Sequence, residues 1–225
     1  MRWRRPGTSS YIPRVTDRPV PRRPAPPRAP EPASEPPDDA PLGVRMRAWC
    51  AGRSWWWRAI ILVVLARQVL YPLREQGDWT LFSGIIFGAH EFGHLFWMPL
   101  GEWMGIAGGS LTQLLIPVGA MALVWRGKDW FGVAVCGLFL ATSLAELSWY
   151  IADARNEMMD LVSFSSEGAI HDWNYLLRHA GLLKSDLAIA RFTRFVAWTL
   201  LLGSTGLSAR LFWWMATTKP AEIAP

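Results

Sequence analysis

Residues 79–101 read WTLFSGIIFGAHEFGHLFWMPLG, an apolar stretch of 23 residues in which Glu91 is the one formally charged side chain. A helix needs about 20 such residues to cross the hydrocarbon layer of a membrane. An ionised carboxylate at that depth is costly, and such groups persist mostly when they are paired or bound to a metal. The stretch therefore predicts a transmembrane helix whose polar residues serve a site.

The rest of the chain supports a membrane protein. Only 18% of its 225 residues are charged, 51% are hydrophobic, and it contains 15 Trp. Four more apolar stretches occupy residues 55–73, 103–125, 130–152 and 192–214, with Trp at most of their ends, as at the two rims of a bilayer. We expect an all-α, polytopic transmembrane bundle of about five spans within residues 55–217. A polar connection covers residues 153–191, and a short C-terminal tail covers residues 218–225.

The N-terminal segment differs sharply in composition. Residues 1–41 hold 12 of the 17 Pro, and residues 1–58 hold 12 Arg against five acids. Residues 1–54 are therefore expected to form a disordered Pro/Arg-rich tail, which could bind a partner domain or anionic lipid. Because the basic charge belongs to the tail, the composition argues against nucleic-acid binding. Two distant Cys exclude a disulfide framework and a cysteine zinc finger.

The distribution of Lys and Arg around five spans favours a cytoplasmic N-terminus. Arg126 and Lys128 do not fit, since five spans place them outside.

The sequence His90-Glu91-Phe92-Gly93-His94 carries the chemistry of the first stretch. Histidines four residues apart on a helix project from one face, so both imidazoles can bind one Zn²⁺. Zinc lowers the pKa of a bound water, and Glu91 can accept its proton and pass it to a leaving amine. The plain alternative is a buried His–Glu pair joining two helices. A bis-His haem site is less favoured still, because histidines four residues apart on one helix cannot take opposite axial positions on one iron.

A catalytic zinc usually has a third protein ligand. Glu146, Tyr150 and Asp153 share one helix face; Glu146 matches the depth of the histidines better, while Asp153 lies nearer the rim. His171 is a further alternative. Other residues are candidates for contacts to substrate or to the ligands: Gln113, Tyr150 and Asp172. Asp172 is also expected to cap a short helix that stops at Gly181.

Glycines surround the same region of the chain. Gly93, Gly108 and Gly109 indicate close helix packing. Residues 107–110 could instead form an unwound segment that pairs with an extended substrate.

On these residues the chain resembles the site-2 protease family of intramembrane zinc metalloproteases, in its compact bacterial form. The resemblance rests on the HExxH helix, the glycines after it and an acidic residue on a later span. It implies zinc ligands His90 and His94, Glu91 as general base and acid, and an aspartate as third ligand, for which Asp153 is the match. It also implies an active site toward the cytoplasm.

The sequence thus predicts a zinc metallopeptidase of the bacterial cytoplasmic membrane that cleaves a membrane protein or peptide within or beside the bilayer. Lipids and that substrate are the expected partners. The alternatives are a non-catalytic membrane subunit that retains a structural metal, and another membrane hydrolase or metal-handling protein that uses the same ligands.

Overall fold

The computed structural model describes residues 36–75, 80–159 and 170–218, and these ranges contain helices and no strand. The predicted all-α fold is confirmed for this part of the chain. The helices, in order, are α1 (Leu42–Cys50), α2 (Trp56–Arg74), α3 (Ser83–Trp97), η1 (Met98–Leu100), α4 (Glu102–Arg126), α5 (Trp130–Ala152), α6 (Asp172–His179), η2 (Leu183–Ser185) and α7 (Asp186–Thr217). Most of the predicted N-terminal tail and all but Thr218 of the C-terminal tail lie outside the described residues.

Four segments in the described ranges are long and apolar enough to cross a membrane: α2, α4, α5 and the run Leu183–Thr217, which joins η2 to α7. Three of them begin and end within one residue of the predicted stretches, and α5 matches residues 130–152. The Asp129 side chain caps α5 by accepting a hydrogen bond from the Gly132 amide. These four segments are compatible with a multi-span membrane protein.

The fifth predicted span, residues 79–101, is too short in the structure. Helix α3 has 15 residues, or about 22 Å at 1.5 Å per residue, against a hydrocarbon thickness of about 30 Å. It ends at Trp97 because Pro99 lies in the 3-10 turn η1, and Gly101, with φ +106°, reverses the chain into α4. The apolar stretch of residues 79–101 that suggested a full span therefore contains two turns besides the helix.

Helix α3 begins inside the bundle. The Ser83 hydroxyl donates to Glu146 Oε1 at 2.7 Å, and the Thr80 hydroxyl donates to the same oxygen at 3.2 Å. Glu146 lies six residues before the end of α5, so the start of α3 lies about 9 Å short of that end.

The backbone amides before and at the start of α3 bind side chains. The Leu81 amide donates to Gln68 Oε1 at 2.9 Å, and the amides of Phe82 and Ser83 donate to Thr80 Oγ1 at 3.2 and 3.1 Å. Away from water such groups must find partners within the protein.

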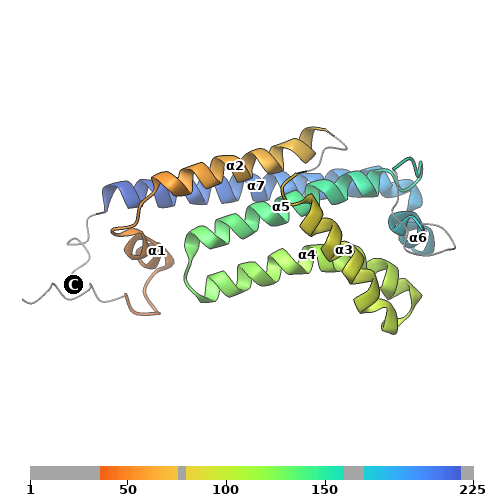
Figure 1. Cartoon of the computed structure of the whole chain (residues 1–225), viewed down its shortest axis with the longest axis horizontal. Helices are drawn as coiled ribbons and strands as arrows, with labels where there is room; N and C mark the ends of the chain where they lie inside the picture. Colours follow the sequence, from red (N-terminus) through yellow and green to blue (C-terminus); the bar gives the residue numbers. More distant parts are fainter. Residues whose placement is uncertain (1–35, 76–79, 160–169, 219–225) are drawn as a thin grey trace, which may run out of the picture. The chain divides into compact units, whose positions relative to one another are not determined.

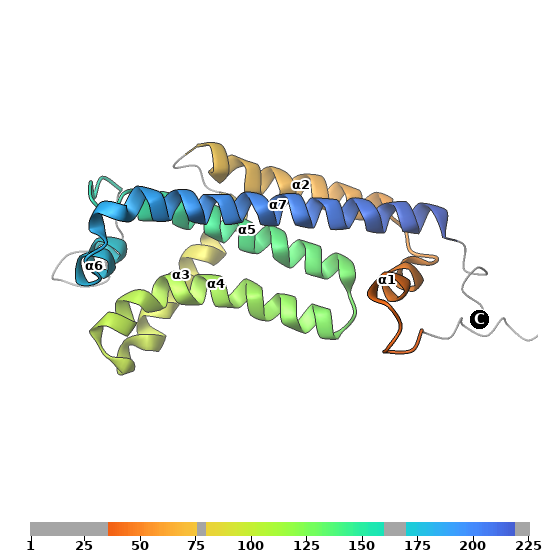
Figure 2. The same cartoon turned by 180° about the vertical axis from the view of Figure 1, so that it is seen from behind.

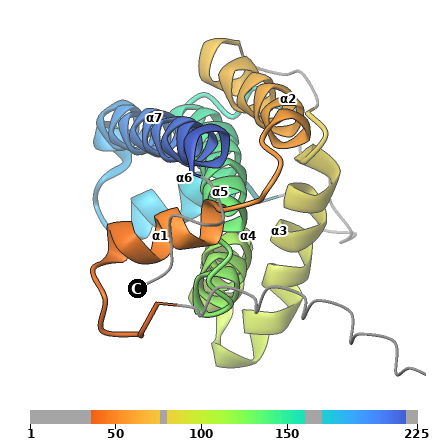
Figure 3. The same ribbon diagram turned by 90° about the vertical axis from the view of Figure 1, so that its left-hand side faces the viewer.

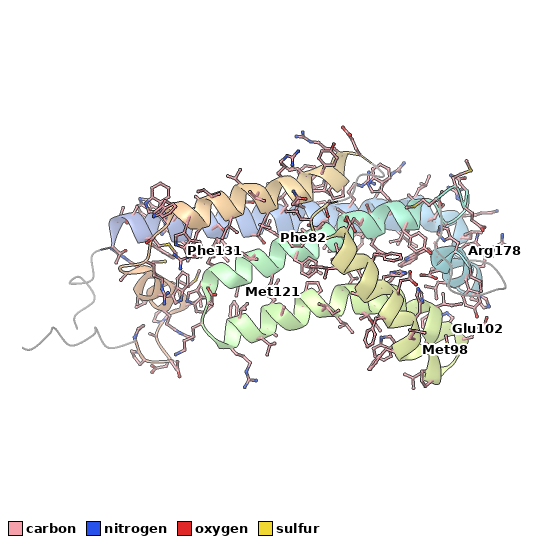
Figure 4. The ribbon with its side chains drawn as sticks, in the orientation of Figure 1. Phe82, Met98, Glu102, Met121, Phe131 and Arg178 are labelled. Carbon is pink, nitrogen blue, oxygen red and sulfur yellow. The ribbon has the colours of Figure 1, made fainter. Side chains whose placement is uncertain are left out.

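Helix α5 is the centre of the bundle and packs against α2, α4 and α7 (Figures 1 and 2). Three apolar clusters lie along its length. Phe131 belongs to the first, which contains Cys50 and Leu211; Leu138 belongs to the second, with Val69 and Leu201; Ile151 belongs to the third, with Ala190. Figure 4 shows the same order, with Phe131 near α1, Phe82 at mid-length and Arg178 on α6. Helices α2 and α5 therefore run in one direction, and α4 and α7 in the other.

The bundle has two ends, which we name by their short helices. The α1 end holds α1, the start of α2, the α4–α5 turn and the end of α7; the α6 end holds the end of α2, the start of α4, α6 and the start of α7. Figure 3 looks along α5 and α7 and shows α1 and α3 from the side, so both cross the direction of the spans.

Helix α1 corrects the predicted extent of the tail, because residues 42–50 are helical rather than disordered. Its apolar face explains the difference: Cys50 is fully buried, and Met46 and Trp49 pack on the same cluster. Burial of this face offsets the entropy of ordering the segment.

Candidate metal centre

Helices α3 and α4 pack closely where two glycines meet. A Cβ atom at Gly93 would overlap the Gly108 carbonyl oxygen, and one at Gly108 would lie 2.6 Å from the Gly93 oxygen. The predicted close packing is therefore present, whereas residues 107–110 are helical and form no unwound segment. This approach turns His90 and His94 toward α4 and α6.

Three ligand-type atoms converge between α3 and α6. His90 Nε2 lies 2.9 Å from Asp172 Oδ2, and His94 Nε2 lies 3.3 Å from the same oxygen. All three atoms lie within 4.8 Å of one another. Ligand atoms around a tetrahedral Zn²⁺, each at about 2.0–2.1 Å, lie about 3.3 Å apart. The spacing therefore suits a single divalent cation.

Each imidazole is oriented through its other nitrogen. His90 Nδ1 lies 3.0 Å from Gln113 Oε1, and the Gln113 amide nitrogen donates to the Ser143 carbonyl at 2.9 Å, which turns Oε1 toward the ring. His94 Nδ1 lies 2.9 Å from the Gly105 carbonyl. Both partners are acceptors, so both Nδ1 atoms carry hydrogen. In the neutral rings Nε2 then carries the free lone pair, which is the group that a histidine needs to bind a metal.

The resulting charge pattern needs a cation. Two Nε2 lone pairs and a carboxylate oxygen face one another, and they repel unless protons or a metal ion lie between them. Burial raises the pKa of Asp172, whereas protonated His90 and His94 rings that donate Nε2–H to Oδ2 lower it below its usual value. In the neutral rings a metal ion would take the place of those protons, and the carboxylate is the form that binds it.

Gly109 keeps open the space in front of the two rings. A Cβ atom there would lie 2.6 Å from His94 Nε2 and 2.7 Å from His90 Nε2. Because the missing side chain leaves room at the two nitrogens, the residues present fit a bound ion.

The structure brings Asp172, rather than Asp153, to the histidines. The Asp153 carboxylate accepts hydrogen bonds from the amides of Met158 and Met159 at 3.1 and 2.9 Å. It lies just beyond α5, where the chain turns back, and these amides hold it in its own loop.

The other two alternatives for the third ligand also have different partners. Glu146 accepts from Ser83 and Thr80 at the start of α3. His171 Nδ1 accepts from the Asn174 amide at 3.3 Å and so caps α6, which leaves its Nε2–H toward Asp153 at 3.5 Å.

The residues predicted to support the site lie around it. Gln113 contacts His90, and the Tyr150 hydroxyl accepts from the Asp172 amide at 3.0 Å. Trp173 Nε1 donates to Ser110 Oγ at 3.1 Å and holds α6 on α4. Asp172 itself, expected as a cap or supporting residue, contacts both rings, and His171 provides the cap. The sequence offered one signal for Asp172, which is its position next to a histidine at the start of a predicted helix. No regular sequence spacing links Asp172 to His90.

Glu91 is half-buried and follows His90 on α3. It is therefore adjacent in sequence to the first of the two histidines, on the same helix.

Comparison with known proteins identifies no relative of this chain. No family model, no curated protein and no solved structure matches the chain.

Proposed function

We propose that the chain is a membrane-embedded zinc metallopeptidase of the site-2 protease type. In this proposal His90, His94 and Asp172 hold the zinc, and Glu91 is the general base and acid. The observation that carries it is the convergence of two oriented imidazoles and one carboxylate, with both imidazoles on the helix that also carries Glu91.

When bound, zinc would polarise a peptide carbonyl and make water a better nucleophile. Glu91 would accept the proton of that water and deliver it to the leaving amine. Gln113 and Gly105 keep the two rings oriented through their Nδ1–H groups, while Tyr150 and Trp173 hold the start of α6, and with it Asp172, against α4 and α5.

The site lies at the α6 end of the spans, so the proposed substrate is a peptide bond near the membrane boundary rather than at its midplane. With four spans, the start of α2 and the end of α7 lie at the α1 end, opposite the proposed metal centre. With the proposed cytoplasmic N-terminus in a bacterial inner membrane, the centre faces the outer side. This differs from the cytoplasmic position that the family resemblance implied.

The proposal is tested with purified full-length protein in detergent, by zinc stoichiometry and by cleavage of a panel of fluorogenic transmembrane peptides. We expect one zinc per chain. E91Q should keep the zinc and lose cleavage, whereas H94A should lose both. A protein that neither contains nor takes up zinc would refute the proposal. Zinc binding without cleavage in wild type would favour the alternative, a non-catalytic membrane subunit with a structural metal.

A further inference from the structure

Helix α1 is placed where a membrane surface would be. It crosses the direction of the four candidate spans (Figure 3). Cys50 anchors it in the apolar cluster with Phe131 and Leu211, and Arg47 Nε donates to Thr218 Oγ1 at 3.3 Å, just beyond α7. A helix that lies across the end of a transmembrane bundle lies in the plane of the headgroups.

Four arginines at the α1 end stack on aromatic rings. Arg53 lies 4.4 Å from the Trp49 ring centroid, and Arg58 lies 4.1 Å from that of Trp57. Arg210 lies 4.7 and 4.5 Å from the rings of Trp213 and Trp214, and Arg45 lies 5.9 Å from that of Trp130. Tryptophan is enriched at headgroup level, where one edge of its ring is apolar and the other wet.

These arginines keep hydrogen-bond donors to spare. Arg53 and Arg58 each donate to one backbone carbonyl, of Trp49 and Ser54, and Arg45 donates to that of Asp38. Within the described ranges, none of these four arginines at the α1 end has a carboxylate at ion-pair distance. A guanidinium carries five N–H donors, and its planar fork matches a phosphate.

The charge of the two ends differs. In the described part of the chain, the α1 end holds seven basic and three acidic residues, a net charge of +4. The rest of the bundle, with the α6 end, holds seven basic and eight acidic residues, a net charge of −1. Arg126 and Lys128, which did not fit a five-span arrangement, belong to the basic end.

We propose that the α1 end binds the phosphate headgroups of anionic phospholipids. The stacked arginines Arg45, Arg53, Arg58 and Arg210 contact the phosphates, and the tryptophans set the depth. This surface lies at the opposite end from the metal centre and does not depend on it. Anionic lipid is concentrated in cytoplasmic leaflets, so the same surface would fix the α1 end on that side.

The test is competitive lipid binding to full-length protein in detergent, measured by native mass spectrometry with equimolar dioleoyl phosphatidylglycerol and dioleoyl phosphatidylcholine. We expect wild type to retain phosphatidylglycerol about tenfold over phosphatidylcholine. The triple variant R45Q/R53Q/R58Q should lose most of this preference, because one basic residue near such a surface contributes up to about fivefold.

A matched control removes the same charge from the α6 end. The variant R74Q/R178Q/R191Q changes three exposed arginines and should keep the wild-type preference. The single variant R53Q changes an exposed side chain and should lower the preference severalfold even if the triple variant fails to fold. Absence of a preference in wild type, an unchanged ratio in R53Q, or an equal loss in the control would overturn the proposal.

Discussion

Asp153, just after α5, and Asp172, at the start of α6, have different hydrogen-bond partners. Asp153 was favoured by resemblance, but two loop amides bind its carboxylate, whereas Asp172 Oδ2 lies within 3.3 Å of both histidine rings. The pair offers a matched test, since both are buried aspartates.

We expect D172N to lower zinc affinity by at least about 100-fold, because a neutral amide is a poor zinc ligand. D153N should keep zinc and lower thermal stability, since its amide group accepts fewer of the same hydrogen bonds. Isothermal titration with zinc, beside melting curves of the apo proteins, measures both effects. If D153N lost zinc while D172N retained it, the ligand assignment would be wrong.

Gly109 offers a test that changes no ligand. In G109A the new methyl group would occupy the space at the two Nε2 atoms, so we expect zinc affinity to fall at least about tenfold while the helix persists. Gly119 is the control in the same helix, because nothing lies within 4 Å of a Cβ there. G119A should bind zinc normally and gain up to about 1 kcal/mol from its higher helix propensity. Equal zinc affinity in the two variants would contradict the geometry.

At the scale of elements, the sequence predicted the helices whose positions depend on local sequence pattern. Tryptophans and hydropathy located α2, α4 and α5 to within a residue, and Gly181, with φ +69°, follows α6 as expected. Two elements were misjudged. Hydropathy measures composition and not helix length, so it missed the turns that shorten α3. Proline density hid α1, whose apolar face becomes evident only against α7. The Asp172 contact joins residues 82 positions apart, and no local pattern encodes it.

Docking of α1 can be tested through Cys50. Burial raises the pKa of the Cys50 thiol to about 11, although Arg53 and Arg58 act in the opposite direction. Below that pH the thiol stays protonated, and only the thiolate reacts. In a C136S background, Cys50 should therefore resist maleimide at pH 8 and react after denaturation. A cysteine introduced at the exposed Ser54 should react at once. Rapid labelling of native Cys50 would mean that α1 is not docked.

At the scale of the whole molecule, the number of spans decides whether the two termini lie on the same side of the membrane. Four spans return the chain to its starting side, whereas the five predicted from hydropathy would leave the two termini on opposite sides. The difference depends on α3, which has 15 residues and is not among the four candidate spans of the described ranges.

Reporter fusions distinguish the two arrangements. Green fluorescent protein fluoresces only in the cytoplasm, so N-terminal and C-terminal fusions to the full chain should give the same signal in bacterial cells. Alkaline phosphatase inserted after His179, at the α6 end, should report the opposite compartment. Opposite signals from the two termini would restore five spans.

The start of α3 lies inside the bundle, and this position limits how the protein can open. The amides of residues 81–83 bind Gln68 and Thr80, and Ser83 binds Glu146. Moving the start of the helix would leave these polar groups without partners in the hydrocarbon layer. Any widening that admits a polypeptide must therefore leave the start of α3 in place. We expect the amides of residues 81–83 to exchange slowly with solvent deuterium, because their partners lie within the bundle.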